Sequence, residues 1–297
     1  MLSSIYRGYD MRRPYSEEWN DFAALHPESS VEAEGLLFRY ISIGDESSPA
    51  IVFLNGGLNT SELWLGYLDC HLIDGYRSII FDYPMEAGSD QELVVAMHTF
   101  LEKLNVRRPV LVGAVFGGVI AQIYANCYRG DVSALVLISS NGMDRSTIRT
   151  FRRKYRFLPA VRSIMKHRNP EKLKRKLQKM GDELAAGESV EDREYIQSMF
   201  SFIFRNYTRE KDLHIKSLMA DIMNQAPMER DDFYSLKGRI LLLFPSDNIL
   251  TAEMQQNLES LMIEPEIRRL RVDSASSYVK PELLLSEIVS FLKRIGY

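Results

Sequence analysis

The sequence predicts an α/β fold with a mostly parallel central sheet flanked by helices. Short, continuous apolar runs alternate along the chain with segments whose apolar side chains recur at helical spacing. Unbroken apolar runs are typical of strands buried on both faces, and strands that alternate with helices favour parallel pairing. The predicted strands cover 36–43, 51–54, 78–84, 109–114, 134–140, 239–247 and 267–272.

The helices are predicted from periodicity and from their first residues. Segment 90–104 places apolar residues three or four positions apart, and 117–129 begins with two glycines. Pro281 suits the first turn of a closing helix. The remaining predicted helices cover 61–70, 252–262 and 281–295.

The region between the strands at 134–140 and 239–247 lacks strand signals. An apolar stripe runs through it at helical spacing, and Pro159 predicts a kink there. The stripe consists of Ile148, Phe151, Tyr155, Leu158 and Val161. We therefore expect an α/β core of residues 1–140 and 233–297, with an inserted helical cap at 141–232.

The composition is that of an ordinary folded chain. The 297 residues are 45% hydrophobic and 26% charged, with a net charge of −3, which excludes a disordered, collagen-like or disulfide-stapled chain. Cys70 and Cys127 are too few and too widely spaced for a redox pair or a cysteine zinc site. No apolar run reaches the roughly 18 residues of a membrane span, and no signal peptide is evident. We expect a cytoplasmic protein with no cofactor, no metal and no transmembrane segment.

Charge is unevenly distributed along the chain. Residues 145–179 contain 14 Lys or Arg and one acid, Glu171, so the rest of the chain is strongly acidic. Such a basic segment with interleaved aromatic residues can bind an anionic ligand, an acidic protein or a membrane surface. It can also be a solvated face that the following acids balance. Nucleic acid is not expected as a partner, because no nucleic-acid-binding motif accompanies the charge.

The most informative run is LVGAVFGGVIAQ at 111–122. It is typical of a strand, then a sharp turn at Val115, then a helix that begins with Gly117 and Gly118. Gly113 and Gly117, on either side of the turn, let the strand and the helix approach closely. This is the spacing of the nucleophile elbow G-x-S-x-G, with Val115 at the position of the nucleophile.

Over nearly its whole length the chain resembles the α/β-hydrolase superfamily. Asn55 and Gly56, followed by Trp64, are similar to the family's oxyanion segment, and Asp247 falls at the position of the family's acid. Segment 274–292 is similar to the C-terminal histidine loop and last helix. The leader WNDFAALHP, the FDYP strand end and the helical cap look most like the maspardin-type branch, which is regarded as largely non-catalytic.

The departures from the family pattern concern the catalytic triad. Val115 has no heteroatom to act as a nucleophile, and the histidine position falls at Ser274 or Ala275. Because no histidine follows His214, only Asp247 remains of the triad. In a serine protease, loss of the nucleophile or of the histidine lowers kcat by about 10⁶-fold, so ordinary hydrolysis is not expected.

The resemblance also implies positions for an oxyanion hole. The backbone N–H groups of Gly57 and Phe116 would form it, and local hydrogen bonding is the expected role of Asn55. The surrounding pocket residues are Asn55, Gly56 and Gly117. The elbow residue of this family has a positive φ, which costs a valine on the order of 1–3 kcal/mol. Val115 therefore either keeps this strain or the turn has relaxed.

A displaced nucleophile is the main alternative. A serine near a strand end would need a nearby base, because a serine without one is inert. The candidates are Ser139, Ser140, Ser246, Ser274, Ser276 and Ser277. His98 is expected to be exposed, His167 and His214 fall in the cap, and His214 could overhang the pocket. Cys127 is expected to be a buried small residue.

These features together favour a non-catalytic binding protein, with its ligand crevice at the carboxyl ends of the strands and beneath the cap. The partner would be a small-molecule ligand or an acidic protein at the pocket or the basic cap. The alternative is an enzyme. It would be an esterase-like hydrolase with a displaced nucleophile, or a lyase or isomerase that uses the pocket without a triad.

Overall fold

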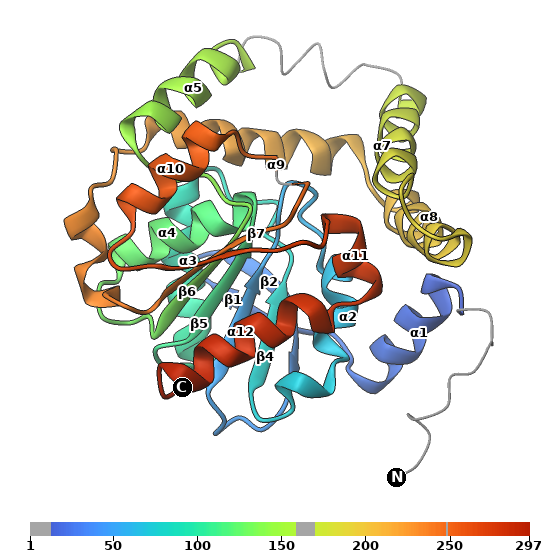
Figure 1. Cartoon of the computed structure of the whole chain (residues 1–297), viewed down its shortest axis with the longest axis horizontal. Helices are drawn as coiled ribbons and strands as arrows, with labels where there is room; N and C mark the ends of the chain where they lie inside the picture. The colour runs from blue at the N-terminus through green and yellow to red at the C-terminus, as the bar shows by residue number, and fades with distance from the viewer. Residues whose placement is uncertain (1–12, 159–169, 248) are drawn as a thin grey trace.

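The computed structural model describes residues 13–158, 170–247 and 249–297. Its centre is an eight-stranded sheet in the order β1-β2-β4-β3-β5-β6-β7-β8 (Figure 1). The β1–β2 and β2–β4 pairs are antiparallel, and the five remaining pairs are parallel. The strands are β1 (Ser29–Ala33), β2 (Leu36–Ile43), β3 (Ala50–Leu54), β4 (Arg77–Phe81), β5 (Val110–Ala114), β6 (Ala134–Ile138), β7 (Ile240–Phe244) and β8 (Glu266–Arg269). The predicted, mostly parallel α/β sheet is confirmed.

Burial of the strands agrees with their composition. Strands β3 to β7 are buried throughout, except for the half-buried Ala114 at the end of β5. Strand β1 was not predicted, because in SSVEA only Ala33 is buried and the local apolar signal is weak. Strand β8 is shorter than the predicted 267–272, since its polar residues lie at the edge of the sheet.

Helices cover both faces of the sheet and form two buried apolar clusters. One cluster includes α3 (Asp90–Lys103), α4 (Phe116–Cys127) and α10 (Ala252–Leu261). The other includes α2 (Leu65–Leu68) and α12 (Glu282–Arg294), and Figure 1 shows α12 crossing in front of the strands. The predicted helix at 61–70 is a 3-10 turn (Ser61–Trp64) followed by α2. The helices predicted from periodicity thus lie where expected, with ends shifted by a few residues.

Residues 141–232, which make up most of the chain between β6 and β7, are called the insert below. Its described residues form helices and turns and contain no strand. The longer helices are α5 (Arg145–Tyr155), α7 (Pro170–Leu184), α8 (Val190–Arg205) and α9 (Arg209–Asp221). A 3-10 turn follows at Ile222–Asn224, and another at Arg230–Leu236 extends past the end of the insert. Ile148 and Phe151 of the predicted stripe are buried, whereas Pro159 and Val161 lie outside the described residues. In Figure 1, α9 runs above one end of the strands, and α7 and α8 lie together at the right of the picture.

Helix α1 (Tyr15–Leu25), which was not predicted as an element, packs against α8. The Tyr15 N–H donates to Ser198 Oγ at 3.1 Å, and the Tyr195 hydroxyl donates to Glu18 Oε2 at 2.8 Å. These contacts tie the N-terminal part of the chain to the insert. None of the helices in the described part of the chain combines the length and apolar character that crossing a membrane requires.

Candidate functional site

The turn between β5 and α4 is the centre of the candidate site. Val115 occupies it with φ 53° and ψ −106°, and its N–H donates to the Ile138 carbonyl on β6 at 2.9 Å. The strand–turn–helix geometry expected of an elbow is therefore present. Since this backbone conformation costs a non-glycine residue on the order of 1–3 kcal/mol, the surrounding contacts must hold the turn.

Three glycines allow the close packing around this turn. A Cβ on Gly117 would overlap the carbonyl group of Leu54 at the end of β3. A Cβ on Gly118 would lie 2.5 Å from Ser140 Cβ, and a Cβ on Gly113 would lie 2.5 Å from the carbonyl carbon of Gly117. These distances are far below van der Waals contact. The first turn of α4 therefore sits directly against the ends of β3, β5 and β6.

The loop after β3 lies beside the elbow. A Cβ on Gly56 would be 3.8 Å from Val115 Cβ, so the two backbones are close neighbours. The N–H groups of Gly57 and Phe116, the expected oxyanion donors, do not donate to any residue that the structure describes. Phe116 also begins α4, whose dipole favours negative charge at that end. Each of the two N–H groups can therefore donate to an oxygen atom outside the described chain.

Asn55 anchors this loop and is only 1% exposed. Its Nδ2 donates to the Phe81 carbonyl at 2.9 Å, and its Oδ1 accepts from Trp64 Nε1 at 3.0 Å. The Tyr83 hydroxyl donates to the Asn55 carbonyl at 2.7 Å. Burial, helped by nearby carboxylates, raises the pKa of Tyr83 well above its ordinary value, so this hydroxyl remains a donor. Local hydrogen bonding is thus what Asn55 does in the structure.

The expected acid and histidine positions lie after β7 and β8. Ala275 is buried in α11 (Ser274–Val279), and the side chain of Ser274 lies outside the described residues. Burial, with a further contribution from the charge of Asp247, raises the pKa of Tyr278 to about 12. Tyr278 also packs edge-on against Phe200 of α8, with ring centroids 6.3 Å apart. A phenol therefore lies near the expected acid, which sequence reasoning missed because no pattern singles out this tyrosine.

Comparison with known proteins agrees with this geometry. A family model described as the alpha/beta hydrolase fold matches residues 49–161. A carboxylesterase structure from Nitrososphaera gargenis aligns with a TM-score of 0.66 at 15% identity, covering 91% of this chain and 99% of that one. Epoxide hydrolase A from Mycobacterium thermoresistibile aligns with a TM-score of 0.62 at 13% identity, covering 90% and 98%. The chain has the α/β-hydrolase fold.

Two curated proteins match shorter stretches of sequence. Epoxide hydrolase 3 of Xenopus tropicalis is 26% identical over 125 residues, which are 39% of this chain and 34% of that protein. Monoacylglycerol lipase ABHD6 of Homo sapiens is 29% identical over 129 residues, 40% of this chain and 38% of that protein. The matched stretch thus spans little more than a third of each relative.

Within this α/β-hydrolase fold, Ser139 stands apart from the other candidate serines. It follows β6 directly, is 7% exposed and has φ 47°, a left-handed backbone like that of Val115. Ser140 is buried and its Oγ donates to the Asn141 carbonyl at 3.2 Å, whereas Ser246 is exposed. Ser277 is buried and hydrogen-bonded to Tyr67, and the side chains of Ser274 and Ser276 lie outside the described residues.

Helix α9 of the insert is tied to the loop after β4. Lys211 Nζ donates to Asp82 Oδ2 at 2.6 Å, and His214 Nε2 lies 2.9 Å from the Ala87 carbonyl oxygen. His214 is therefore buried against this loop, while His167 lies outside the described residues. Neither contact was predicted, because each joins residues that are far apart in the sequence.

A third contact joins Asp221, at the end of α9, to the backbone of Asp90 at the start of α3. The Asp90 N–H donates to Asp221 Oδ2 at 2.9 Å, while the buried Asp90 carboxyl has no hydrogen-bond partner in the described part of the chain. Burial, and then the charge of Asp221, raises the pKa of Asp90 well above its ordinary value. Met219 of the same helix lies over the oxyanion loop, 3.9 Å from where a Cβ on Gly57 would be. Helix α9 thus covers this loop.

Two expectations about single residues were wrong. His98 is half-buried rather than exposed, because its ring stacks on Tyr128 at 3.7 Å and its Nδ1 lies 2.9 Å from the Tyr124 hydroxyl. Cys127 is exposed rather than buried, because it ends α4 beside the exposed Gln91 of α3. Helical spacing within one segment does not show which residues of another segment lie beside His98 or Cys127.

The elbow presents backbone N–H groups and an aliphatic side chain. Among residues 13–158, 170–247 and 249–297, no three His, Cys, Asp or Glu side chains gather as metal ligands would. Two backbone N–H donors, from Gly57 and Phe116, lie at the elbow beside the apolar, half-buried side chain of Val115.

Proposed function

We propose that this α/β-hydrolase-fold protein binds a ligand or a partner at its elbow without hydrolysing it. The observation that carries the proposal is Val115 at the turn, with φ 53°. An aliphatic side chain has no lone pair with which to attack a carbonyl or an epoxide carbon, so it cannot form a covalent intermediate. A degenerate triad of this kind would leave the fold and the binding site in place.

The region after β8 supports the same proposal. Ala275 cannot act as a base, and no histidine follows His214 in the sequence. Burial and the charge of Asp247 raise the pKa of the nearby Tyr278 to about 12. A phenol with such a pKa is a poor general base at neutral pH, since a useful base has a pKa near the working pH.

We further propose that the insert, residues 141–232, acts as a cap over a core of 1–140 and 233–297. Support comes from α9, whose Met219 lies over Gly57 and whose Lys211 is paired with Asp82 at 2.6 Å. A small ligand would then lie between α9 and the elbow, with its carbonyl or anionic oxygen at the two N–H donors. The lysines and arginines of 145–158 and 171–179 in the same insert are exposed and offer a complementary surface to an acidic protein.

The alternative is an enzyme, and Ser139 is the observation that favours it. Its strained backbone at the end of β6, next to the elbow strand, resembles the conformation that exposes a nucleophile. The names of the curated relatives, an epoxide hydrolase and a monoacylglycerol lipase, also favour a hydrolase. A lyase or isomerase would need only the pocket and the two N–H donors.

Labelling with a fluorophosphonate probe tests the proposal. Native and denatured protein, wild type and Ser139→Ala, are incubated with the probe, and the intact mass is measured. The proposal expects no adduct on native wild-type protein. A single adduct that forms only on native protein and disappears in Ser139→Ala would overturn it and establish the displaced nucleophile. Ester, epoxide and lactone turnover assays on the same samples would detect activity that leaves no adduct.

A further inference from the structure

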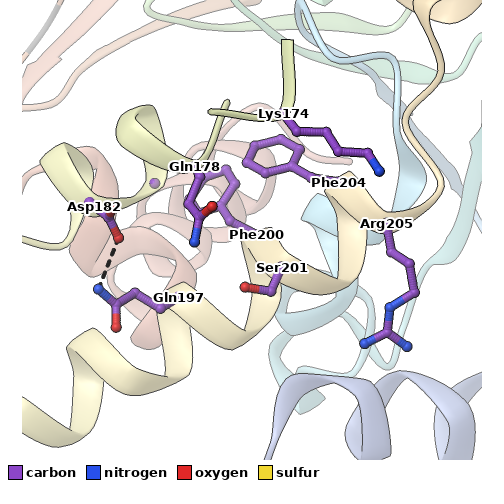
Figure 2. A pocket seen from close by; sticks show the side chains of 9 residues that line it. Lys174, Gln178, Asp182, Gln197, Phe200, Ser201, Phe204 and Arg205 are labelled. Carbon is purple, nitrogen blue, oxygen red and sulfur yellow. Dashed lines mark hydrogen bonds between the residues drawn. The ribbon is translucent and has the colours of Figure 1, made fainter. Parts of the chain in front are cut away.

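A groove lies between α7 and α8 of the insert (Figure 2), and no residue of the elbow lines it. Its cavity volume is about 470 Å³, which lies in the range of small-molecule sites, about 300–1,000 Å³. All the residues that line it belong to these two helices. The groove therefore does not depend on the elbow, on Val115 or on the loop after β3.

At one end of the groove, two polar side chains are hydrogen-bonded to each other. Gln197 Nε2 on α8 donates to Asp182 Oδ1 on α7 at 3.0 Å, as the dashed line in Figure 2 shows. Gly181 permits this close approach, because a Cβ there would already lie 3.1 Å from the ring of Phe200. The one carboxylate that lines the groove is thus engaged by an amide.

The other end of the groove is cationic. Lys174 on α7 and Arg205 on α8 both line it, and Figure 2 shows the Lys174 side chain reaching past the ring of Phe204. Lys174 pairs with Glu171 at 3.7 Å, but both side chains are more than half exposed, and such surface pairs contribute little. Arg205 forms no ion pair within the described residues. Two positive charges are therefore available to a ligand at this end.

The inner wall of the groove is aromatic. Phe200 and Phe204 stack with ring centroids 5.3 Å apart and are 4% and 6% exposed, and Phe200 also packs against Tyr278 of α11. Gln178 and Ser201 also line the groove and supply hydrogen-bonding groups. An occupant that fits this arrangement has one anionic end and one apolar end.

We propose that this groove binds an amphiphilic monoanion, with a carboxylate or phosphate ester head and an alkyl tail. The head contacts Lys174 and Arg205, where charge-assisted hydrogen bonds are the strongest polar contacts available. The tail lies against Phe200 and Phe204, away from water. This site is independent of the proposed function at the elbow, so either proposal can fail without the other.

Isothermal titration of the full chain with three eight-carbon probes tests the site. Octanoate and octyl phosphate carry the anionic head, and 1-octanol has the same tail without charge. We expect one anion bound per chain and an affinity for 1-octanol at least about tenfold weaker. Tighter binding of octanoate would identify a free fatty acid as the ligand type, and tighter binding of octyl phosphate a phosphorylated lipid.

Variants place the binding in the groove. The double variant Lys174→Gln, Arg205→Gln should weaken octanoate binding about tenfold or more, whereas Lys176→Gln, an exposed lysine of α7 outside the groove, should leave it unchanged. Ser201→Trp fills the groove while both charges stay, and should abolish binding. Thermal unfolding checks that each variant is folded. Equal affinity for 1-octanol and octanoate, more than one anion per chain, or wild-type binding by the double variant would overturn the proposal.

Discussion

Val115 keeps a backbone conformation that glycine adopts without strain, so Val115→Gly should be more stable than Val115→Ala. A non-glycine residue at φ 53° is strained by on the order of 1–3 kcal/mol. Glycine removes this strain, but its larger conformational entropy in the unfolded chain offsets about 0.5–1 kcal/mol of the gain in stability. The glycine variant should therefore have a free energy of unfolding about 1 kcal/mol above that of the alanine variant. Alanine is the reference because it lacks the half-buried methyl groups of valine.

The same pair of substitutions at Val95 provides the matched control. Val95 lies inside α3, is 37% exposed and has the ordinary negative φ of a helix. There glycine should be about 1 kcal/mol less stable than alanine, because it lowers helix propensity without relieving strain. The sign of the glycine–alanine difference should therefore be opposite at the two positions.

Urea unfolding followed by circular dichroism measures both differences, provided that all four variants unfold with a common slope. A Val115→Gly protein that is no more stable than Val115→Ala would refute the reasoning, if the Val95 pair shows its expected loss. That result would mean that the surrounding glycines and the bond to Ile138 hold the turn without measurable strain at this residue.

Three further substitutions test other parts of the structure. Because burial raises the pKa of Asp90, the folded chain holds a proton that the unfolded chain releases, so stability falls as pH rises from about 4 towards the folded pKa. Asp90→Asn should therefore be more stable than wild type at neutral pH, and its free energy of unfolding should vary less with pH. Parallel plots of unfolding free energy against pH for the two proteins would contradict this. Lys211→Met removes the 2.6 Å pair with Asp82 and should cost about 1 kcal/mol in urea unfolding; a loss that 1 M salt does not reduce would argue against an electrostatic origin. Gly117→Ala should cost about 3 kcal/mol or more, because its Cβ overlaps backbone. Gly187→Ala is the control, because its added Cβ meets nothing within 4 Å, and it should be nearly neutral. Equal melting temperatures for Gly117→Ala and Gly187→Ala would contradict the backbone overlap at Gly117.

The elbow could be predicted because its signals are local. A continuous apolar run forms β5, Gly117 and Gly118 lie in the first turn of α4, and Val115 stands between the strand and the helix. In contrast, β1 and α1 lacked a strong local pattern and were found only in the structure. Their stability comes from partners elsewhere in the chain, such as the pairing of β1 with β2 and the packing of α1 on α8.

Three features of the protein were determined by the sequence alone. These are the α/β class, the valine at the elbow and the concentration of basic residues at 145–179. Each depends on the order of residue types along one stretch of chain, which periodicity and spacing report directly.

Only the tertiary structure decided which groups meet around the site. It brings Tyr278 near Asp247, lays α9 over the oxyanion loop, and opens the groove between α7 and α8. Periodicity shows that one face of a helix is buried but not what covers that face. Contacts between residues that are distant in sequence are set by the packing of whole elements, so no local pattern specifies them.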